Sequence, residues 1–336
     1  MAKVIKTFVS VLVAIGTFFG PAIAQDFAPA PAAGFWEYYP PRVAARITSY
    51  NKTMQAAGLV GPEASKGVFA SPLVWPPSIK KINVCFFNGH RAFHQLIAMT
   101  ALEWTIGNVL IPLDFGDLNQ PRACSENEFS HIRVSLNDKG QNYSAVGILS
   151  YKSFAQTEES MSISVVNPNT KKLVNAIDLR RAVLHEFGHA LGLAHEHQSP
   201  FGKCEEEYNW KYIYRDSAKP PLKWSKKVVD HNMRQLNRPG TFASEFDKDS
   251  IMLYTFPEQF FKAGKNSSCF SEENYSISKV DRDVIAELYP ADQKRRYTLY
   301  EERRKHLLET AKNSKAADNS KSAALQLLND FLPEIK

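Results

Sequence analysis

Three histidines and a glutamate occur at fixed offsets in the stretch HEFGHALGLAH, residues 185–195. Residues four apart share one face of a helix, so His185 and His189 can bind the same metal ion. Glu186 projects beside them, where it can take a proton from an attacking water. Gly192 lets the chain leave the helix and turn back, which brings His195 round as a third nitrogen ligand and leaves a fourth position open. An open position predicts catalysis rather than a structural role.

Zinc (Zn2+) is the predicted metal of this site. Three neutral imidazoles and a water suit its tetrahedral preference, and it lowers the pKa of that water to about 7. Cobalt and manganese are the alternative metals. The competing interpretation is a helix whose histidines only pack or face solvent, and the number of matching offsets disfavours it.

Several elements must position these residues. The active-site helix is expected to be capped by Asp178 and to end at Gly192. A strand is expected over residues 160–166, where apolar and polar side chains alternate, and a final helix from Ser278 with Asp281 as its capping-box partner. The remaining expected elements are strands at 82–87, 111–115 and 131–136 and a helix at 90–109.

Residues 185–195 resemble the extended zinc signature of the metzincin peptidases, and Glu196 directly after them resembles the astacin branch. Residues 250–254, S-I-M-L-Y, are similar to the Met-turn of that family. The resemblance implies an α+β zincin fold over residues 78–290: a two-subdomain catalytic domain with a twisted mixed sheet, a backing helix and the active-site helix. It also implies one catalytic zinc on His185, His189 and His195, Met252 as the floor beneath it, and Tyr254 as a fifth ligand or oxyanion donor.

One departure from the astacin pattern is an additional histidine. Typical astacins continue the zinc motif as H-E-Q-S-R, whereas residues 195–199 of this chain are H-E-H-Q-S. His197 is therefore either an alternative ligand or, as we expect, a residue beside the ligands or at the surface.

The expected activity is that of a secreted zinc metalloendopeptidase, which hydrolyses internal peptide bonds by a zinc-activated water with Glu186 as general base. Tyr254 is expected to support the oxyanion. The polypeptide substrate is expected to pair with the strand at 160–166, unless another strand covers it. Two alternatives come from other classes: a catalytically silent zinc-fold binding module, and an amidase acting on cell-wall crosslinks. Phe256, Phe260 and Phe261 are either a pocket wall or, more commonly for phenylalanines, core.

The two ends of the chain predict export and two extensions. Residues 1–24 have the pattern of a signal peptide, with two lysines, a short apolar run and an Ala-Ile-Ala cleavage site. The run is too short to span a bilayer, so a secreted chain without a transmembrane segment is expected, extracellular or periplasmic. Residues 25–77, rich in Pro and Ala, predict an N-terminal extension or pro-segment with one helix around 41–57. Residues 291–336 predict charged helices that dock on the catalytic domain or form a tail.

Four cysteines in an exported chain permit two disulfides in three connectivities, or free buried thiols. We expect Cys85 to pair with Cys124 and Cys204 with Cys269, because each pair then lies within one half of the catalytic region. The formal net charge of +6 falls by two when the signal peptide, with Lys3 and Lys6, is removed. This mildly basic balance does not indicate a nucleic-acid partner.

Overall fold

The computed structural model describes residues 73–106, 111–199, 201–219, 224–235 and 246–332. It also describes six positions of the N-terminal extension, all in helical conformation: Arg42, Ala45, Arg46, Ser49, Lys52 and Thr53. These six fall within the helix expected at 41–57. The predicted signal peptide and the rest of residues 25–72 lie outside the described residues, as do the last three positions of the helix expected at 90–109.

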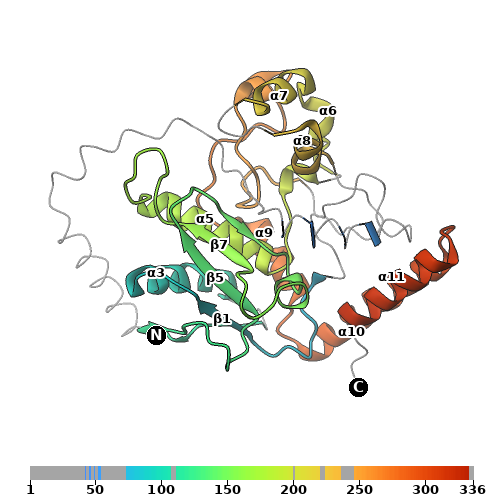
Figure 1. Cartoon of the computed structure of the whole chain (residues 1–336). Helices are drawn as coiled ribbons and strands as arrows, with labels where there is room; N and C mark the ends of the chain where they lie inside the picture. Colours follow the sequence, from blue (N-terminus) through green and yellow to red (C-terminus); the bar gives the residue numbers. More distant parts are fainter. Residues whose placement is uncertain are drawn as a thin grey trace. The chain divides into compact units, whose positions relative to one another are not determined.

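A five-stranded mixed sheet organises the first half of the catalytic region (Figure 1). Its strand order is β2 (Leu113–Asp114), β1 (Ile82–Phe86), β5 (Ile132–Asn137), β7 (Met161–Ser164) and β6 (Tyr143–Ser144). The first four strands run parallel, and β6 pairs antiparallel with β7. A separate ribbon joins β3 (Gly116–Asp117) to β4 (Gln120–Pro121). The predicted mixed α+β architecture is confirmed.

The strand predicted to receive substrate is not the edge of this sheet. β7 pairs with β5 on one side and with β6 on the other, where Tyr143 lies opposite Ser162 and Ser144 opposite Met161. All four residues of β7 are buried. The prediction of an open strand at 160–166 was therefore wrong, because a two-residue strand too short to show an alternating pattern covers it.

Two helices pack together beside the sheet, α3 (Arg91–Ala101) and α5 (Ala176–Ala190). A 3-10 turn, η2 (Leu102–Thr105), continues α3, and its Trp104 donates an indole hydrogen bond to the Leu184 carbonyl at 2.9 Å. Strand and helix residues share the main core, to which Val84, Val134, Val183, Leu184 and Phe187 belong. The active-site helix thus rests on the sheet along its apolar face.

The start of α5 differs from the prediction that Asp178 caps it. Asn175 is the cap, because its backbone is extended and its side chain accepts the Asp178 N–H at 2.8 Å. Asp178 lies in the first turn, where its negative charge complements the helix dipole. The predicted end is confirmed, since Gly192 follows the helix with a φ of +102°.

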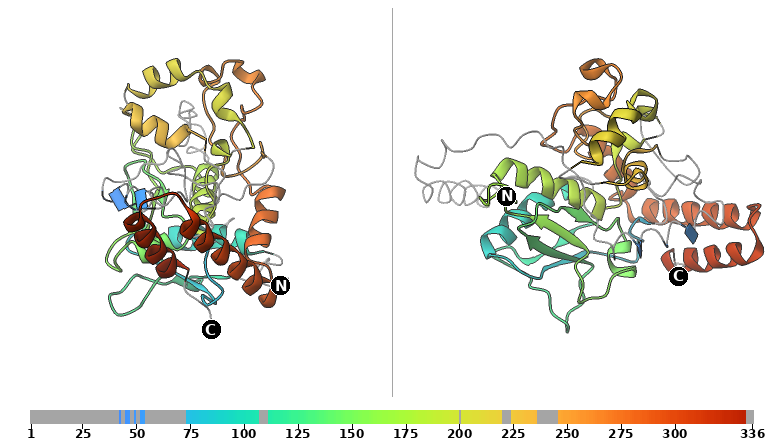
Figure 2. Two further views of the ribbon diagram at one scale, coloured as in Figure 1. Left: turned by 90° about the vertical axis from the view of Figure 1, so that its right-hand side faces the viewer. Right: turned by 45° about the horizontal axis from the view of Figure 1, so that its top comes forward.

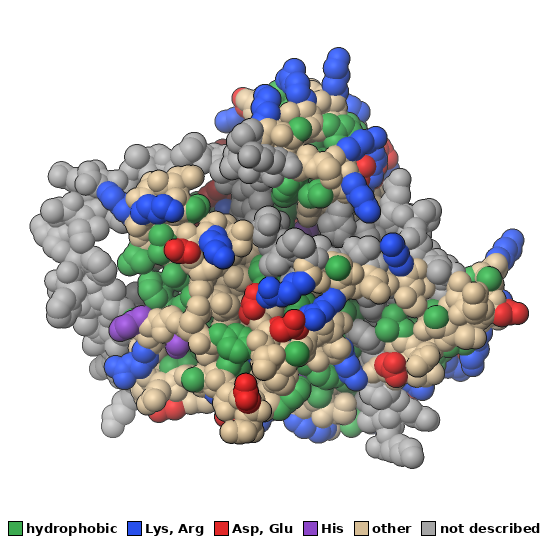
Figure 3. Space-filling model, in the orientation of Figure 1, with side chains coloured by type: hydrophobic (Ala, Val, Ile, Leu, Met, Phe, Trp, Pro, Cys, Tyr) green, Lys and Arg blue, Asp and Glu red, His purple; other side chains and the backbone are tan. Residues whose placement is uncertain are grey.

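The second half consists of short helices around a separate aromatic core: α6 (Cys204–Glu207), α7 (Trp210–Ser217), α8 (Lys226–Met233), η4 (Glu258–Phe260) and η5 (Gly264–Asn266). Phe256, Phe260 and Phe261 are all buried in this core, as the core interpretation expected. Basic side chains gather over α7 and α8 (Figure 3), where the exposed ones are Lys211, Arg215, Lys219, Lys226 and Lys227.

Both predicted disulfides are present. Cys85 bonds to Cys124 in the sheet half, and Cys204 bonds to Cys269 in the second half. All four cysteines are therefore used, and the alternative of free thiols is excluded.

Three helices close the chain. α9 (Lys279–Leu288) begins with the predicted capping box between Ser278 and Asp281. α10 (Gln293–Asn313) and α11 (Asp318–Phe331) lie side by side (Figure 2) and share a small core with Tyr300, Leu307 and Leu328. Within the described ranges, no helix combines the length and apolar character that a membrane span requires. Short turns complete the described structure, α4 (Leu149–Lys152) and η3 (Glu196–Gln198).

Candidate metal and active site

The three predicted metal ligands converge on one point. His185, His189 and His195 are buried, and their ligand nitrogens all lie within 4.8 Å of one another. The Nε2 atom of His189 is 3.1 Å from the Nε2 of His185 and 3.1 Å from the Nε2 of His195. Two of the ligands come from successive turns of α5, and the third comes from the segment after Gly192.

The outer nitrogen of each ring faces an oxygen acceptor. Nδ1 of His185 lies 2.8 Å from the Ile251 carbonyl, and Nδ1 of His189 lies 2.7 Å from the Leu193 carbonyl. Nδ1 of His195 lies 3.2 Å from the side-chain oxygen of Gln198. A neutral imidazole that donates from Nδ1 keeps a lone pair on Nε2, so all three inner nitrogens are acceptors.

This donor set fits zinc. Nitrogens bound tetrahedrally at about 2.0–2.1 Å from zinc lie roughly 3.3–3.4 Å apart, close to the 3.1 Å that separates His189 Nε2 from the Nε2 atoms of His185 and His195. Three lone pairs directed at one another repel unless a cation lies between them. The cluster therefore accommodates one catalytic zinc.

The Met-turn supports this cluster from below. Met252 is buried, and its sulfur would lie 2.3 Å from a Cβ atom built on Gly188, so any larger residue in the helix here would displace the Met252 side chain. Ile251 accepts the His185 hydrogen bond, and the Met252 carbonyl accepts the Glu196 N–H at 3.1 Å. The turn thus contacts both the helix and the third-ligand segment.

Asp281 holds the Met-turn, a role that its capping position did not reveal. Its carboxylate accepts hydrogen bonds from the Ser250 hydroxyl at 2.7 Å and from the Ile251 N–H at 2.9 Å. Burial raises the pKa of Asp281. No local pattern signals this second role, because it depends on a contact between distant segments.

The predicted base and the predicted tyrosine lie at the same site. Glu186 is completely buried, one residue after the first ligand. Tyr254 is also buried, with its ring centroid 4.2 Å from that of His195 and 5.6 Å from that of His185. The structure therefore brings Tyr254 and the three ligands together, and it places buried Glu186 directly after the first of those ligands.

Tyr143 and Glu159 are neighbours of the site that sequence reasoning missed. The Tyr143 hydroxyl donates to the Glu159 carboxylate at 3.0 Å. Burial raises the pKa of Tyr143, and the charges of Glu159 and Glu186 raise it further. Tyr143 thus lies within electrostatic range of the predicted base.

His197 lies beside the zinc ligands and is not among them. Its Nε2 contacts the Asn232 carbonyl at 2.8 Å, which turns that nitrogen away from the cluster. Its ring stacks on Tyr254 with centroids 4.8 Å apart and meets Phe256 edge-on at 4.9 Å. The expectation of a neighbouring residue is confirmed, and the alternative of an exposed one is wrong because His197 is buried.

Glu196, used above only as a mark of the astacin branch, is a buried acid. Burial raises its pKa to about 8, partly offset by the hydrogen bond it accepts from the Asp247 N–H at 3.0 Å. The charges of Asp281 and Asp247 raise that pKa further. The side chains of Glu196, Asp247 and Asp281 therefore lie within electrostatic range of one another.

Comparison with solved structures finds similar chains, and the first of the three below supports this fold. A structure of myroilysin aligns with 66% of this chain and 98% of its own, at 28% identity and a TM-score of 0.55. A second structure, a crystal structure of myroilysin, aligns with 76% of this chain and 100% of its own, at 25% identity and a TM-score of 0.45. High choriolytic enzyme 1, a hatching enzyme zinc-protease from Oryzias latipes (medaka fish), aligns with 65% of this chain and 94% of its own. Its sequence identity is 17% and its TM-score is 0.40. No protein-family model and no curated protein matches the chain in sequence.

The fold and the histidine cluster together define a zinc metalloprotease with one catalytic zinc. Within that class, the match to myroilysin confirms the resemblance to the astacin-like metzincins that residues 185–196 and 250–254 predicted.

Proposed function

We propose that this chain is a secreted zinc endopeptidase that hydrolyses internal bonds of polypeptides, with Glu186 as general base. The observation that carries the proposal is the convergence of three histidine Nε2 atoms at the end of α5, the helix that also carries the buried Glu186 directly after the first ligand. Bound zinc supplies Lewis-acid chemistry: it polarises the scissile carbonyl and lowers the pKa of a coordinated water.

Two side chains of the site have separate roles, one in proton transfer and the other in charge stabilisation. Glu186 accepts the proton of the attacking water and passes it to the leaving amine. The Tyr254 phenol donates a hydrogen bond to the oxyanion as charge develops there. The ring contacts of Tyr254 with His195 and His197 support this role, because they hold the phenol beside the ligands.

The N-terminal extension acts as a pro-segment in this proposal. Arg46 pairs with Glu158 through contacts of 2.6 and 3.1 Å, and Arg42 pairs with Glu159, which also accepts the Tyr143 hydroxyl. Arg46 also lies 4.9 Å from the ring centroid of Phe154. These contacts support a helix of the extension held beside the site.

The boundary between extension and catalytic domain at residue 78 stays a prediction. Leu73, Val74 and Trp75, which precede it, are buried in the main core, so cleavage before residue 73 would preserve that packing. Export is supported by the two disulfides, which persist in oxidising compartments, and by the pattern of residues 1–24.

The deciding experiment is Glu186→Gln in the zinc-loaded protein. The amide preserves the size of the side chain but cannot accept the proton, so casein digestion should fall by at least about 100-fold. Zinc content should stay at one ion per chain. Wild-type digestion should also stop when a chelator is added and return with zinc.

Two results would contradict the proposal. An undiminished rate in Glu186→Gln would exclude the base. A wild-type protein that binds zinc but shows no chelator-sensitive digestion would favour the silent binding module. If it released material from peptidoglycan and left casein intact, the amidase alternative would replace it.

A further inference from the structure

The C-terminal hairpin, formed by α10 and α11, contains a buried arginine that contacts two residues bound to the end of the zinc-binding helix. Arg296, in the first turn of α10, is 2% exposed. Its Nη2 donates to the carbonyls of Trp75 at 3.4 Å, Pro76 at 3.1 Å and Ile79 at 3.5 Å. Its guanidinium also lies 5.6 Å from the ring centroid of Tyr289. Arg296 thus ties α10 to the segment that enters the catalytic domain.

Two of the residues that Arg296 contacts form hydrogen bonds to the end of α5. The Trp75 indole donates to the Ala190 carbonyl at 2.8 Å, and the Tyr289 hydroxyl donates to the Leu191 carbonyl at 2.6 Å. The Trp75 N–H in turn donates to that hydroxyl at 3.3 Å. The last carbonyls of a helix have no partner within it, so these side chains complete its C-terminal end.

The turn that delivers the third ligand begins at this point. Gly192 has a φ of +102°, and a Cβ atom there would lie 3.6 Å from the Tyr289 hydroxyl and 3.8 Å from Val74. One residue later, the Leu193 carbonyl accepts the ring hydrogen bond of His189. The course of this turn therefore affects both the orientation of His189 and the position of His195.

We infer that Arg296 is a positioning residue for the zinc ligands. By holding Trp75 and Tyr289, it fixes the end of α5 and the turn at Gly192. The C-terminal hairpin is then a working part of the zinc site and not a removable tail. The inference rests on the histidines binding zinc, and it stands even if the zinc-loaded protein proves unable to hydrolyse peptides.

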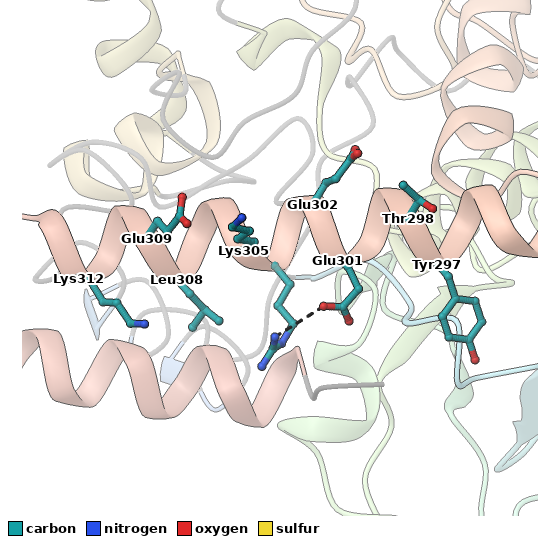
Figure 4. Close-up of a pocket in the computed structure, with 9 residues that line it drawn as sticks. Tyr297, Thr298, Glu301, Glu302, Lys305, Leu308, Glu309 and Lys312 are labelled. Atoms are coloured by element: carbon teal, nitrogen blue, oxygen red, sulfur yellow. Dashed lines mark ion pairs between the residues drawn. The ribbon is translucent and has the colours of Figure 1, made fainter. Parts of the chain in front are cut away.

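The test is the zinc affinity of full-length variants, measured by competition with a chelator of known affinity. Arg296→Gln removes the charge and most of the three contacts, and should weaken zinc binding about tenfold, the lower range for groups that orient metal ligands. The matched control is Lys305→Gln, which removes one charge from an exposed position of the same helix, along a groove of about 720 Å³ (Figure 4). Its affinity should equal that of the wild type.

A second variant tests the route through Trp75. Trp75→Phe retains a ring and removes the donor to Ala190, so it should weaken zinc binding by a similar factor. The double variant should bind zinc no more weakly than either single variant, because both changes remove the same support. Fully additive losses would overturn this route.

A merely structural role gives a different result. In that case Arg296→Gln would lower the melting temperature of the metal-free protein while the folded fraction kept wild-type zinc affinity, and the inference would be wrong. If Arg296→Gln does not fold, Arg296→Lys keeps the charge but cannot span three carbonyls. A folded Arg296→Lys with wild-type zinc affinity would equally overturn the inference.

Discussion

At the scale of single residues, the geometry of the zinc site depends on the groups that hold the three ligands as well as on the ligands. Each histidine is oriented by an acceptor on its outer nitrogen, and two of those acceptors are backbone carbonyls, of Ile251 and Leu193. Asp281 in turn holds the Met-turn to which Ile251 belongs. The zinc geometry therefore depends on how well these backbone segments are fixed.

His131 makes folding stability depend on pH. It is buried against Trp75, Phe129 and Tyr151, and its Nδ1 accepts the Asn83 N–H at 3.0 Å. Burial lowers the pKa of His131 to about 4, and the charge of Arg133 contributes. Between pH 6.5 and 4 the unfolded chain therefore binds a proton that the folded protein does not.

Acidification from pH 6.5 to 4 should thus lower the free energy of unfolding through His131, on the order of 2–3 kcal/mol. His131→Gln should flatten this part of the pH dependence, as measured by urea unfolding at pH 7 and pH 4. His306→Gln, at an exposed position of α10, is the control and should keep the wild-type slope. Equal slopes in the His131 variant and the wild type would contradict this account.

At the scale of elements, the sequence correctly predicted those features that depend on residues only a few positions apart. The active-site helix, its end at Gly192 and the capping box of α9 follow from offsets of a few residues, and all are present. The helix start was misassigned because Asn175 and Asp178 are both good caps, and the backbone conformation decides between them.

Pairing across the sheet could not be predicted in the same way. Whether β7 is an edge depends on β6, a two-residue strand that precedes it and carries no alternating pattern. Arg296 lies more than 200 residues after its carbonyl partners, so no sequence period connects them. Contacts of this kind depend on the folded topology, and the spacing of residues along the chain does not predict them.

The helical part of the extension carries a prediction at this scale. Arg42→Ala with Arg46→Ala removes both ion pairs to Glu158 and Glu159. Such pairs contribute roughly 0.2–1 kcal/mol each. The fraction of unprocessed molecules in which the extension has left the site should therefore rise roughly 2- to 30-fold. The initial rate of the intact chain, verified by mass spectrometry, should rise in proportion.

Lys52→Ala is the control for this change, since Lys52 is an exposed cation of the same stretch. Its rate should match that of the wild type. High salt should raise the rate of the wild type and have less effect on the double arginine variant, because salt screens the pairs that the variant already lacks. A double variant as slow as the wild type would show that these pairs do not restrain activity.

At the scale of the whole catalytic domain, the site lies where two cores meet. Phe187 and Met252 belong to the core of the sheet half, whereas Tyr254 and Phe256 belong to the aromatic core of the second half. The chain passes from one core to the other within the Met-turn. The two ligands on α5, His185 and His189, and the proposed oxyanion donor are thus fixed by different cores, and each core contains or adjoins one disulfide.

This division predicts that the two disulfides affect different properties. Cys204→Ala with Cys269→Ala should lower the free energy of unfolding by about 2–4 kcal/mol, measured by urea denaturation. Because Cys204, Cys269 and Tyr254 share one core, kcat should also fall, by roughly tenfold, as the phenol loses its fixed position. Zinc affinity should stay near the wild-type value, since His185 and His189 lie on α5 in the other core.

Cys85→Ala with Cys124→Ala is the matched control. It should lower stability by a comparable amount, but with Tyr254 still held in the aromatic core, kcat of the zinc-loaded protein should change less than in the first pair. If the Cys204 and Cys269 variant instead loses zinc affinity in step with kcat, the two cores do not act separately. The ligands and Tyr254 would then belong to one cooperative unit, with the Met-turn as the connection that transmits the loss.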